Sequence, residues 1–263
     1  MKCLRGFFPY LGQTLVVLAI TLSLISVACA AIPAGFENNK SEPCACRYQS
    51  AIQAGGEWFL RNQNDNFLYY HYNFISRKYS SLDNPLRQMG SLWAVTRLAK
   101  YLDDDRFTQL ADRGFAYFEK HFKSDTQDGF YYIDMGTGSL KLGETAFIML
   151  ALLGMEHPQK DFYLEKFARG VMSLQQPDGS FNTRYYSDER SSVDYYPGEA
   201  LVAMMSLYEY QPRPEYLACV QKAFPYYVDY FRSIHKTDFV PWQSPLQMDY
   251  WLGLAPLQYH RCF

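Results

Sequence analysis

This chain of 263 residues has no excess of basic residues. It contains 25 Lys and Arg and 27 Asp and Glu, which gives a formal net charge of −2 at pH 7. Nucleic-acid-binding proteins usually carry a basic patch, so a nucleic-acid partner is not expected. The patterns GxGxxG, GxSxG and HExxH and the P-loop are also absent. No His or Cys spacing resembles a zinc site, and no other feature requires a cofactor. We therefore expect neither a metal nor a cofactor.

Long apolar runs are scarce as well. The N-terminal run TLVVLAITLSLISVA is shorter than the roughly 20 residues of a membrane-spanning helix. Lys2 and Arg5 precede it and ACA at 28–30 fits a cleavage site, so residues 1–30 are predicted to be a secretory signal peptide. The predicted location is secreted or periplasmic. An alternative makes Cys29 the lipidated N-terminus of a lipoprotein, and only then would the protein contact a membrane.

The rest of the chain is predicted to be one domain behind a short lead-in. Residues 31–47 are polar and irregular, which is typical of a linker or tether. Residues 48–263 are long enough, in a chain that is 48% hydrophobic, to bury a sizeable core. The cysteines beyond the signal peptide are Cys44, Cys46, Cys219 and Cys262. In an oxidising compartment they could form two disulfides, with three pairings open; a bond between the first two would be strained.

Almost all of the domain is predicted to be helical, with two kinds of helix in alternation. The segments 107–122, 163–174 and 216–231 are amphipathic, whereas 145–155 and 199–208 are apolar on nearly all sides. Amphipathic segments begin near residues 48, 106, 161 and 215, and the others begin near 87, 143, 198 and 242. This period of roughly 55 residues is typical of repeated helical hairpins. It predicts an α/α toroid with the apolar helices inside a ring.

A Gln or Glu recurs at the start of each predicted inner helix. The four residues are Gln88, Glu144, Glu199 and Gln243. Because each inner helix would begin at the same end of the ring, these side chains are expected to face one shared opening, which we call the mouth.

Several phrases resemble known toroid families. LQQPDGSF, with Gln175, Gly179 and Phe181, resembles the Q-x-x-x-G-x-aromatic phrase of terpenoid-cyclase and prenyltransferase toroids. LGETAF and YPGEALVAM, with RQMG and FVPW, are more similar to secreted toroids that act on carbohydrate, namely six-hairpin glycosidases and the helical domain of D-glucuronyl C5-epimerase-like proteins. The final LAPLQYHRCF does not read as a closing outer helix, so we expect a small ring or a truncated copy.

Three acidic residues are the predicted catalytic groups: Glu199, Glu144 and Asp194. Glycoside cleavage needs two carboxyl groups, one protonated and one ionised. A glutamate in a first helical turn is also favoured by the helix dipole for structural reasons, and that dipole lowers a carboxyl pKa, which suits a base better than an acid. Asp178 lies in a PDG turn and is predicted to be structural.

The predicted substrate-binding residues are Arg87, Gln88, His71, Tyr195, Trp242 and Gln243. Arg87 could clamp the carboxylate of a uronic acid, Trp242 could stack on a sugar, and His71 could move a proton. Each of these side chains could instead serve packing alone, as most of the 23 Tyr and 19 Phe must.

The leading hypothesis is an exported enzyme that acts on a poly- or oligosaccharide by acid/base chemistry. The reaction would be hydrolysis, C5 epimerisation or elimination. A non-catalytic glycan-binding or scaffold protein on a degenerate toroid is the main alternative. An isoprenoid-handling toroid is a third, disfavoured by the export signal and by the lack of an aspartate-rich motif matching terpene enzymes.

Overall fold

A computed structural model of the chain describes residues 44–234. The chain divides between Ser50 and Ala51 into two units. Except for the beginning of the first helix, the described helices and strands all belong to the second unit. The helices are α2 (Cys44–Arg61), α3 (Pro85–Leu102), α4 (Asp105–Glu119), α5 (Leu142–Gly154), α6 (Lys160–Ser173), α7 (Tyr196–Tyr210) and α8 (Pro214–Ile234). None of these described helices combines the length and the apolarity needed to cross a bilayer.

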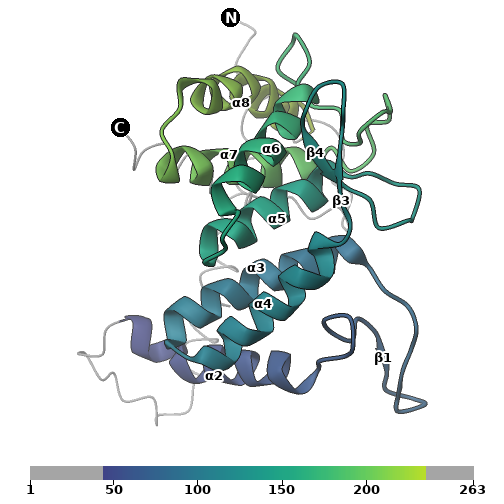
Figure 1. Ribbon diagram of the computed structural model, residues 1–263, viewed down its shortest axis with the longest axis vertical. Helices are drawn as coiled ribbons and strands as arrows, with labels where there is room; N and C mark the ends of the chain where they lie inside the picture. Colours follow the sequence, from purple (N-terminus) through teal and green to yellow (C-terminus); the bar gives the residue numbers. More distant parts are fainter. Residues whose placement is uncertain (1–43, 235–263) are drawn as a thin grey trace, which may run out of the picture. The chain divides into compact units, whose positions relative to one another are not determined.

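The helices alternate between inner and outer positions, as the repeat predicts. α5 packs against α3 and against α7, while α4 packs on α3, α6 on α5 and α8 on α7 (Figure 1). α3, α5 and α7 are therefore inner helices, and α4, α6 and α8 are outer helices. The prediction of an all-α toroid of helical hairpins is confirmed. The predicted inner helix near residue 242 lies outside the described residues.

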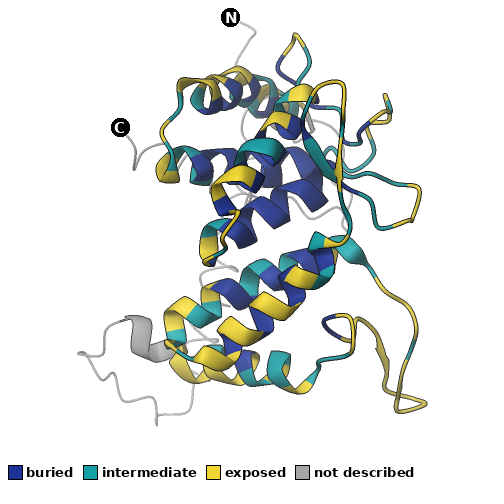
Figure 2. Ribbon diagram, in the orientation of Figure 1, coloured by how far each residue is buried: buried dark blue, intermediate teal, exposed yellow. Residues whose placement is uncertain are grey.

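Burial explains why the inner helices lack a polar face. Every residue of Leu142–Leu152 in α5 and of Tyr196–Met205 in α7 is buried, so both ribbons are dark nearly all round in Figure 2. An outer helix buries one side only, as α4 does with Phe107, Phe115 and Phe118. Each large apolar side chain removed from water stabilises the fold by about 1.5–3 kcal/mol.

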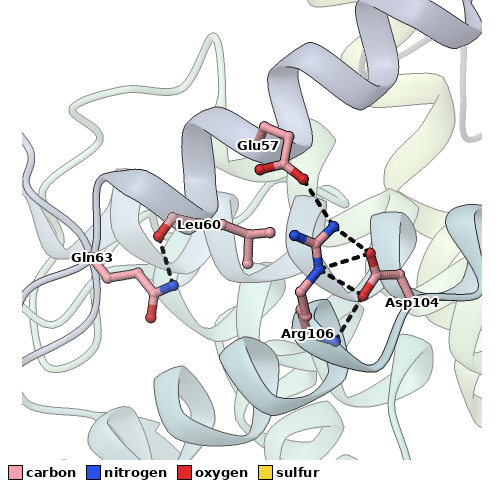
Figure 3. A network of polar contacts seen from close by, with 5 residues as sticks. All are labelled: Glu57, Leu60, Gln63, Asp104 and Arg106. Atoms are coloured by element: carbon pink, nitrogen blue, oxygen red, sulfur yellow. Dashed lines mark hydrogen bonds and ion pairs between the residues drawn. The ribbon is translucent and has the colours of Figure 1, made fainter.

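Polar side chains fix where the first helices begin. Asn84 caps α3, its side chain accepting the Arg87 N–H at 3.2 Å, and Asp104 caps α4 by accepting the Arg106 N–H at 3.0 Å. The Arg106 guanidinium also binds both Asp104 oxygens and reaches Glu57 of α2 at 2.8 Å (Figure 3). The connection between α3 and α4 is therefore also the point at which α2 is held to the start of α4.

Two short β-hairpins depart from the predicted all-helical pattern. They are formed by β1 (Tyr72–Asn73) with β2 (Lys78–Tyr79), and by β3 (Phe122–Ser124) with β4 (Tyr131–Ile133). The helix predicted over 107–122 ends at Glu119, because Phe122 leaves the helix and packs edge-to-face on Phe167 at 4.8 Å. At the other end, α2 begins at Cys44 rather than near residue 48.

Among the described residues, one of the four cysteines that could form disulfides can be assessed, and it is a free thiol. This residue is Cys219 on α8, which is buried. Burial raises the pKa of this thiol to about 12, so it is protonated and unreactive at neutral pH. The side chains of Cys44 and Cys46, and the whole of Cys262, lie outside the described residues.

Candidate functional site

The mouth is the end of the toroid where the inner helices begin. The chain reaches α3, α5 and α7 through the long connections 62–84, 120–141 and 174–195. At the opposite end the connections are only 103–104, 155–159 and 211–213. Both hairpins lie in the long connections, so the irregular structure of the described chain gathers beside the first turns of the inner helices. Loops carried on a rigid scaffold are where binding and catalytic groups are usually found.

Glu144 lies in the first turn of α5 and is completely buried, with 0% of its surface exposed. Burial raises the pKa of its carboxyl, and Lys141, whose Nζ lies 3.1 Å from Oε1, opposes that rise. The other oxygen, Oε2, is buried and has no hydrogen-bond partner among the described residues. Glu144 therefore has an ammonium group beside one oxygen and no hydrogen-bond partner for the other among the described residues.

Glu199 occupies the equivalent turn of α7 and is 5% exposed. Burial alone raises the pKa of its carboxyl to about 8. The helix-dipole argument, which favours a lowered pKa, is therefore wrong in direction here: withdrawal from water outweighs the dipole. Its Oε2 also lacks a partner within residues 44–234. Glu199 is thus protonated at neutral pH and has an O–H available for donation.

Gly143 is the point at which three inner helices meet. A Cβ atom built on Gly143 would lie 2.8 Å from Tyr196 Cδ1 and 2.9 Å from Leu86 Cδ1, and closer still to Glu199 Oε2. The Glu199 carboxyl therefore rests directly on the first turn of α5, one residue before Glu144. The structure brings these two predicted catalytic residues onto adjoining turns. Sequence reasoning missed Gly143, although a glycine precedes the glutamate in both LGE and PGE.

Asp194 and Tyr195 lie immediately before α7, as predicted. Asp194 Oδ1 accepts the hydroxyl of Tyr230, on outer helix α8, at 2.9 Å. Burial, with this bond as the second cause, raises the pKa of Tyr230 to about 12. Asp194 therefore has a structural role, because its bond to Tyr230 joins the mouth to the outer layer. The Tyr195 side chain is exposed.

The other predicted binding residues are more dispersed. Gln88 is buried and donates to Leu68 O at 2.6 Å and to Asp83 Oδ1 at 2.9 Å, which fixes the connection before α3. Arg87 is exposed beside it. His71 is exposed in the first hairpin region, where its Nδ1 lies 2.9 Å from Ser80 Oγ. Trp242 and Gln243 lie outside the described residues.

The QQPDGSF segment connects the loop before inner helix α7 to outer helix α8. Gln175 Nε2 donates to Cys219 O at 2.8 Å, and the Phe181 N–H donates to the Tyr227 hydroxyl at 2.8 Å. Asp178 accepts from the Ser180 N–H and hydroxyl, which confirms its structural role. The phrase thus ties the connection before α7 to α8.

Across the described chain, no group of three or more His, Cys, Asp or Glu side chains is arranged to hold a metal ion.

Comparison with solved structures supports the class of fold. A GH76 α-mannanase of Bacteroides thetaiotaomicron matches with a TM-score of 0.57 and 12% sequence identity, over 82% of this chain and 64% of the mannanase chain. A polysaccharide lyase matches with a TM-score of 0.53 and 13% identity, over 84% of this chain and 69% of the lyase chain. This chain therefore spans less than two thirds of the mannanase. The fold is that of an α/α toroid, as the helical repeat predicts.

No protein-family profile matches the sequence, and no curated protein matches it.

Proposed function

We propose that the protein is an exported enzyme that breaks or rearranges a bond in a poly- or oligosaccharide by acid/base catalysis at the mouth. Hydrolysis is the first choice; C5 epimerisation or elimination would apply if the sugar is a uronic acid. The N-terminal segment predicted to be a signal peptide supports export. A mannanase and a polysaccharide lyase among the structural neighbours support a saccharide substrate.

The observation that carries this proposal is the buried carboxyl of Glu199, whose Oε2 has no hydrogen-bond partner among the described residues. A general acid must hold its proton at the working pH, and a pKa of about 8 achieves this near neutrality. Buried carboxyls with strongly shifted pKa values are concentrated at functional sites. Glu199 combines that shift with an unpartnered oxygen at the start of an inner helix.

The second carboxyl of the proposed reaction is Glu144. Lys141 favours its ionised form, because the ammonium group lies 3.1 Å from Oε1. Within residues 44–234 no cation has an equivalent role at Glu199, whose pKa is raised by burial. In the proposed mechanism Glu199 protonates the leaving oxygen, and Glu144 acts as base or nucleophile, the division of roles that glycoside cleavage requires.

The test is an NMR time course in D2O with two probes, yeast α-mannan and polygalacturonate. New reducing-end signals would indicate hydrolysis, an unsaturated product elimination, and deuterium at C5 epimerisation. Glu199→Gln should lower kcat about 10²- to 10⁴-fold, the usual contribution of a general acid. Glu215→Gln is the matched control, because Glu215 is an exposed acid in the first turn of outer helix α8, and full activity is expected. Full activity in Glu199→Gln would contradict the proposal.

A second candidate function is non-catalytic glycan binding or scaffolding. It is favoured by the burial of the two carboxyls, since exposures of 0% and 5% leave a substrate almost no surface to touch. Saturable binding of either probe by a folded protein that changes neither would establish this function instead.

A further inference from the structure

One tyrosine at the mouth is held in an unfavourable backbone conformation and yet faces solvent. Tyr186, in the connection 174–195, has φ +56° and is 63% exposed. Side chains larger than Asn rarely adopt this left-handed region, because Cβ approaches the backbone. Such strain persists only where surrounding contacts enforce it, and it is concentrated at functional sites.

The backbone around Tyr186 is anchored to the start of α5. The Leu142 N–H donates to Thr183 O at 3.0 Å, and the Tyr185 N–H donates to Leu140 O at 2.9 Å. Tyr185 itself is buried, and its hydroxyl donates to Thr145 Oγ1 at 3.1 Å. Thr145 directly follows Glu144 in the first turn of α5. The residue before Tyr186 is therefore hydrogen-bonded to the neighbour of a proposed catalytic residue.

The Tyr186 ring is held by the second hairpin. Its hydroxyl donates to Asp125 Oδ2 at 2.5 Å, and Asp125 Oδ1 in turn accepts the N–H groups of Gln127 and Asp128 at 2.9 and 2.7 Å. The ring lies edge-on to Tyr132, with centroids 5.5 Å apart and planes at 81°. Phe130 lies 6.5 Å away at 27°. The ring is therefore oriented in advance, which lowers the entropy cost of binding a ligand.

We propose that Tyr186 is a substrate-binding residue whose ring packs against one sugar unit of the glycan. An exposed, oriented phenol suits a pyranose, because the C–H face of the sugar packs on the aromatic face while the sugar hydroxyls stay in water. This inference rests on the proposed function, since it takes a saccharide as the ligand. It assigns affinity to Tyr186 and leaves proton transfer to the glutamates.

The competing explanation is a purely structural role, which we call the strap. In this role the Tyr186 hydroxyl serves only to hold the second hairpin to the connection 174–195 through its bond to Asp125. Two variants separate the alternatives. Tyr186→Phe removes the bond to Asp125 and keeps the ring, whereas Tyr186→Ala removes both. Tyr101→Ala is the matched control, because Tyr101 is 51% exposed at the far end of α3, away from the mouth.

Binding is measured by isothermal titration calorimetry with yeast α-mannan and with polygalacturonate. The full chain is used in the Glu199→Gln background, so that turnover does not consume the probe. On the probe that binds, Tyr186→Ala should raise Kd about tenfold, Tyr186→Phe less than about threefold, and Tyr101→Ala not at all. In the active protein, Tyr186→Ala should raise KM and leave kcat unchanged.

The outcomes separate this inference from the proposed function. Equal losses of affinity in Tyr186→Phe and Tyr186→Ala, with the same fall in Tm, would establish the strap and overturn the stacking role. Turnover by the wild type with unchanged binding in Tyr186→Ala would also overturn it, while the proposed function stands. Binding that depends on Tyr186, without turnover, would support the stacking role of Tyr186 and contradict the proposal that the protein is an enzyme. A folded protein that binds neither probe would overturn both.

Discussion

Replacing Glu199 by Gln is expected to stabilise the protein at neutral pH, although it should impair the proposed reaction. The unfolded chain releases the Glu199 proton as the pH passes the ordinary value of 4.5, whereas the folded chain keeps it until about pH 8. Between these values the unfolded state binds fewer protons than the folded state, so the free energy of unfolding falls as the pH rises. Gln cannot ionise in either state and avoids this loss.

The size of the effect follows from the pKa difference. Each pKa unit corresponds to about 1.4 kcal/mol, so the buried Glu199 carboxyl lowers the free energy of unfolding by about 3 kcal/mol at pH 7 and by about 5 kcal/mol above pH 8. The amide has nearly the shape of the protonated carboxyl. Wild type and Glu199→Gln should therefore be similar near pH 4.5 and differ by about 3 kcal/mol at pH 7.

The assay is urea unfolding from about pH 4.5 to about pH 8.5, followed by circular dichroism. The wild-type free energy of unfolding should decline across this range relative to that of Glu199→Gln. Glu215→Gln serves as the control, because Glu215 is exposed and its replacement should leave the wild-type decline in place. Parallel curves for wild type and Glu199→Gln would refute the reasoning, since they would mean that Glu199 titrates alike in the folded and unfolded chains.

Three further predictions concern the neighbouring groups. Lys141→Met should raise the pKa of Glu144 by removing its cation, so the acidic limb of the kcat/KM pH profile should move to higher pH; an unmoved limb would exclude Glu144 as the base. Gly143→Ala should lower the free energy of unfolding by about 1–3 kcal/mol through overpacking, measured by urea unfolding. Gly55→Ala on α2, where the new Cβ meets nothing within 4 Å, should instead be neutral or stabilising by up to about 1 kcal/mol, and equal effects would contradict the packing argument. Cys219 should resist iodoacetamide in the folded protein and react after denaturation, as followed by mass spectrometry; rapid labelling of the folded protein would contradict its burial.

Periodicity predicted the helical layers well because burial acts on many residues at once. The apolar runs of α5 and α7 could lie only inside other structure, and their helix bounds agree with the predicted starts near 143 and 198. The hairpins were missed because strands of two or three residues are too short to show alternation. Tyr72 and Tyr79 form a strand pair that composition alone does not distinguish from core aromatics.

The candidate site was predicted less completely, because its chemistry depends on contacts distant in sequence. The recurrence of glutamate at the helix starts correctly marked Glu144 and Glu199 as equivalent positions. The direction of the Glu199 pKa shift was missed, because the helix dipole is visible in sequence but the loss of water is not. The orientation of the Tyr186 ring could not be predicted from sequence, since its hydroxyl bonds to Asp125, 61 residues earlier in the chain.

The unequal connections at the two ends of the toroid have a consequence for engineering. The tight links 103–104, 155–159 and 211–213 leave little freedom in how successive helices pair, so changes there should disturb the packing of the whole ring. The connections at the mouth, by contrast, could be exchanged with those of other toroids while the helices that carry them stay the same. Chimaeras made by such exchange would separate the contribution of the scaffold from that of its loops, one connection at a time.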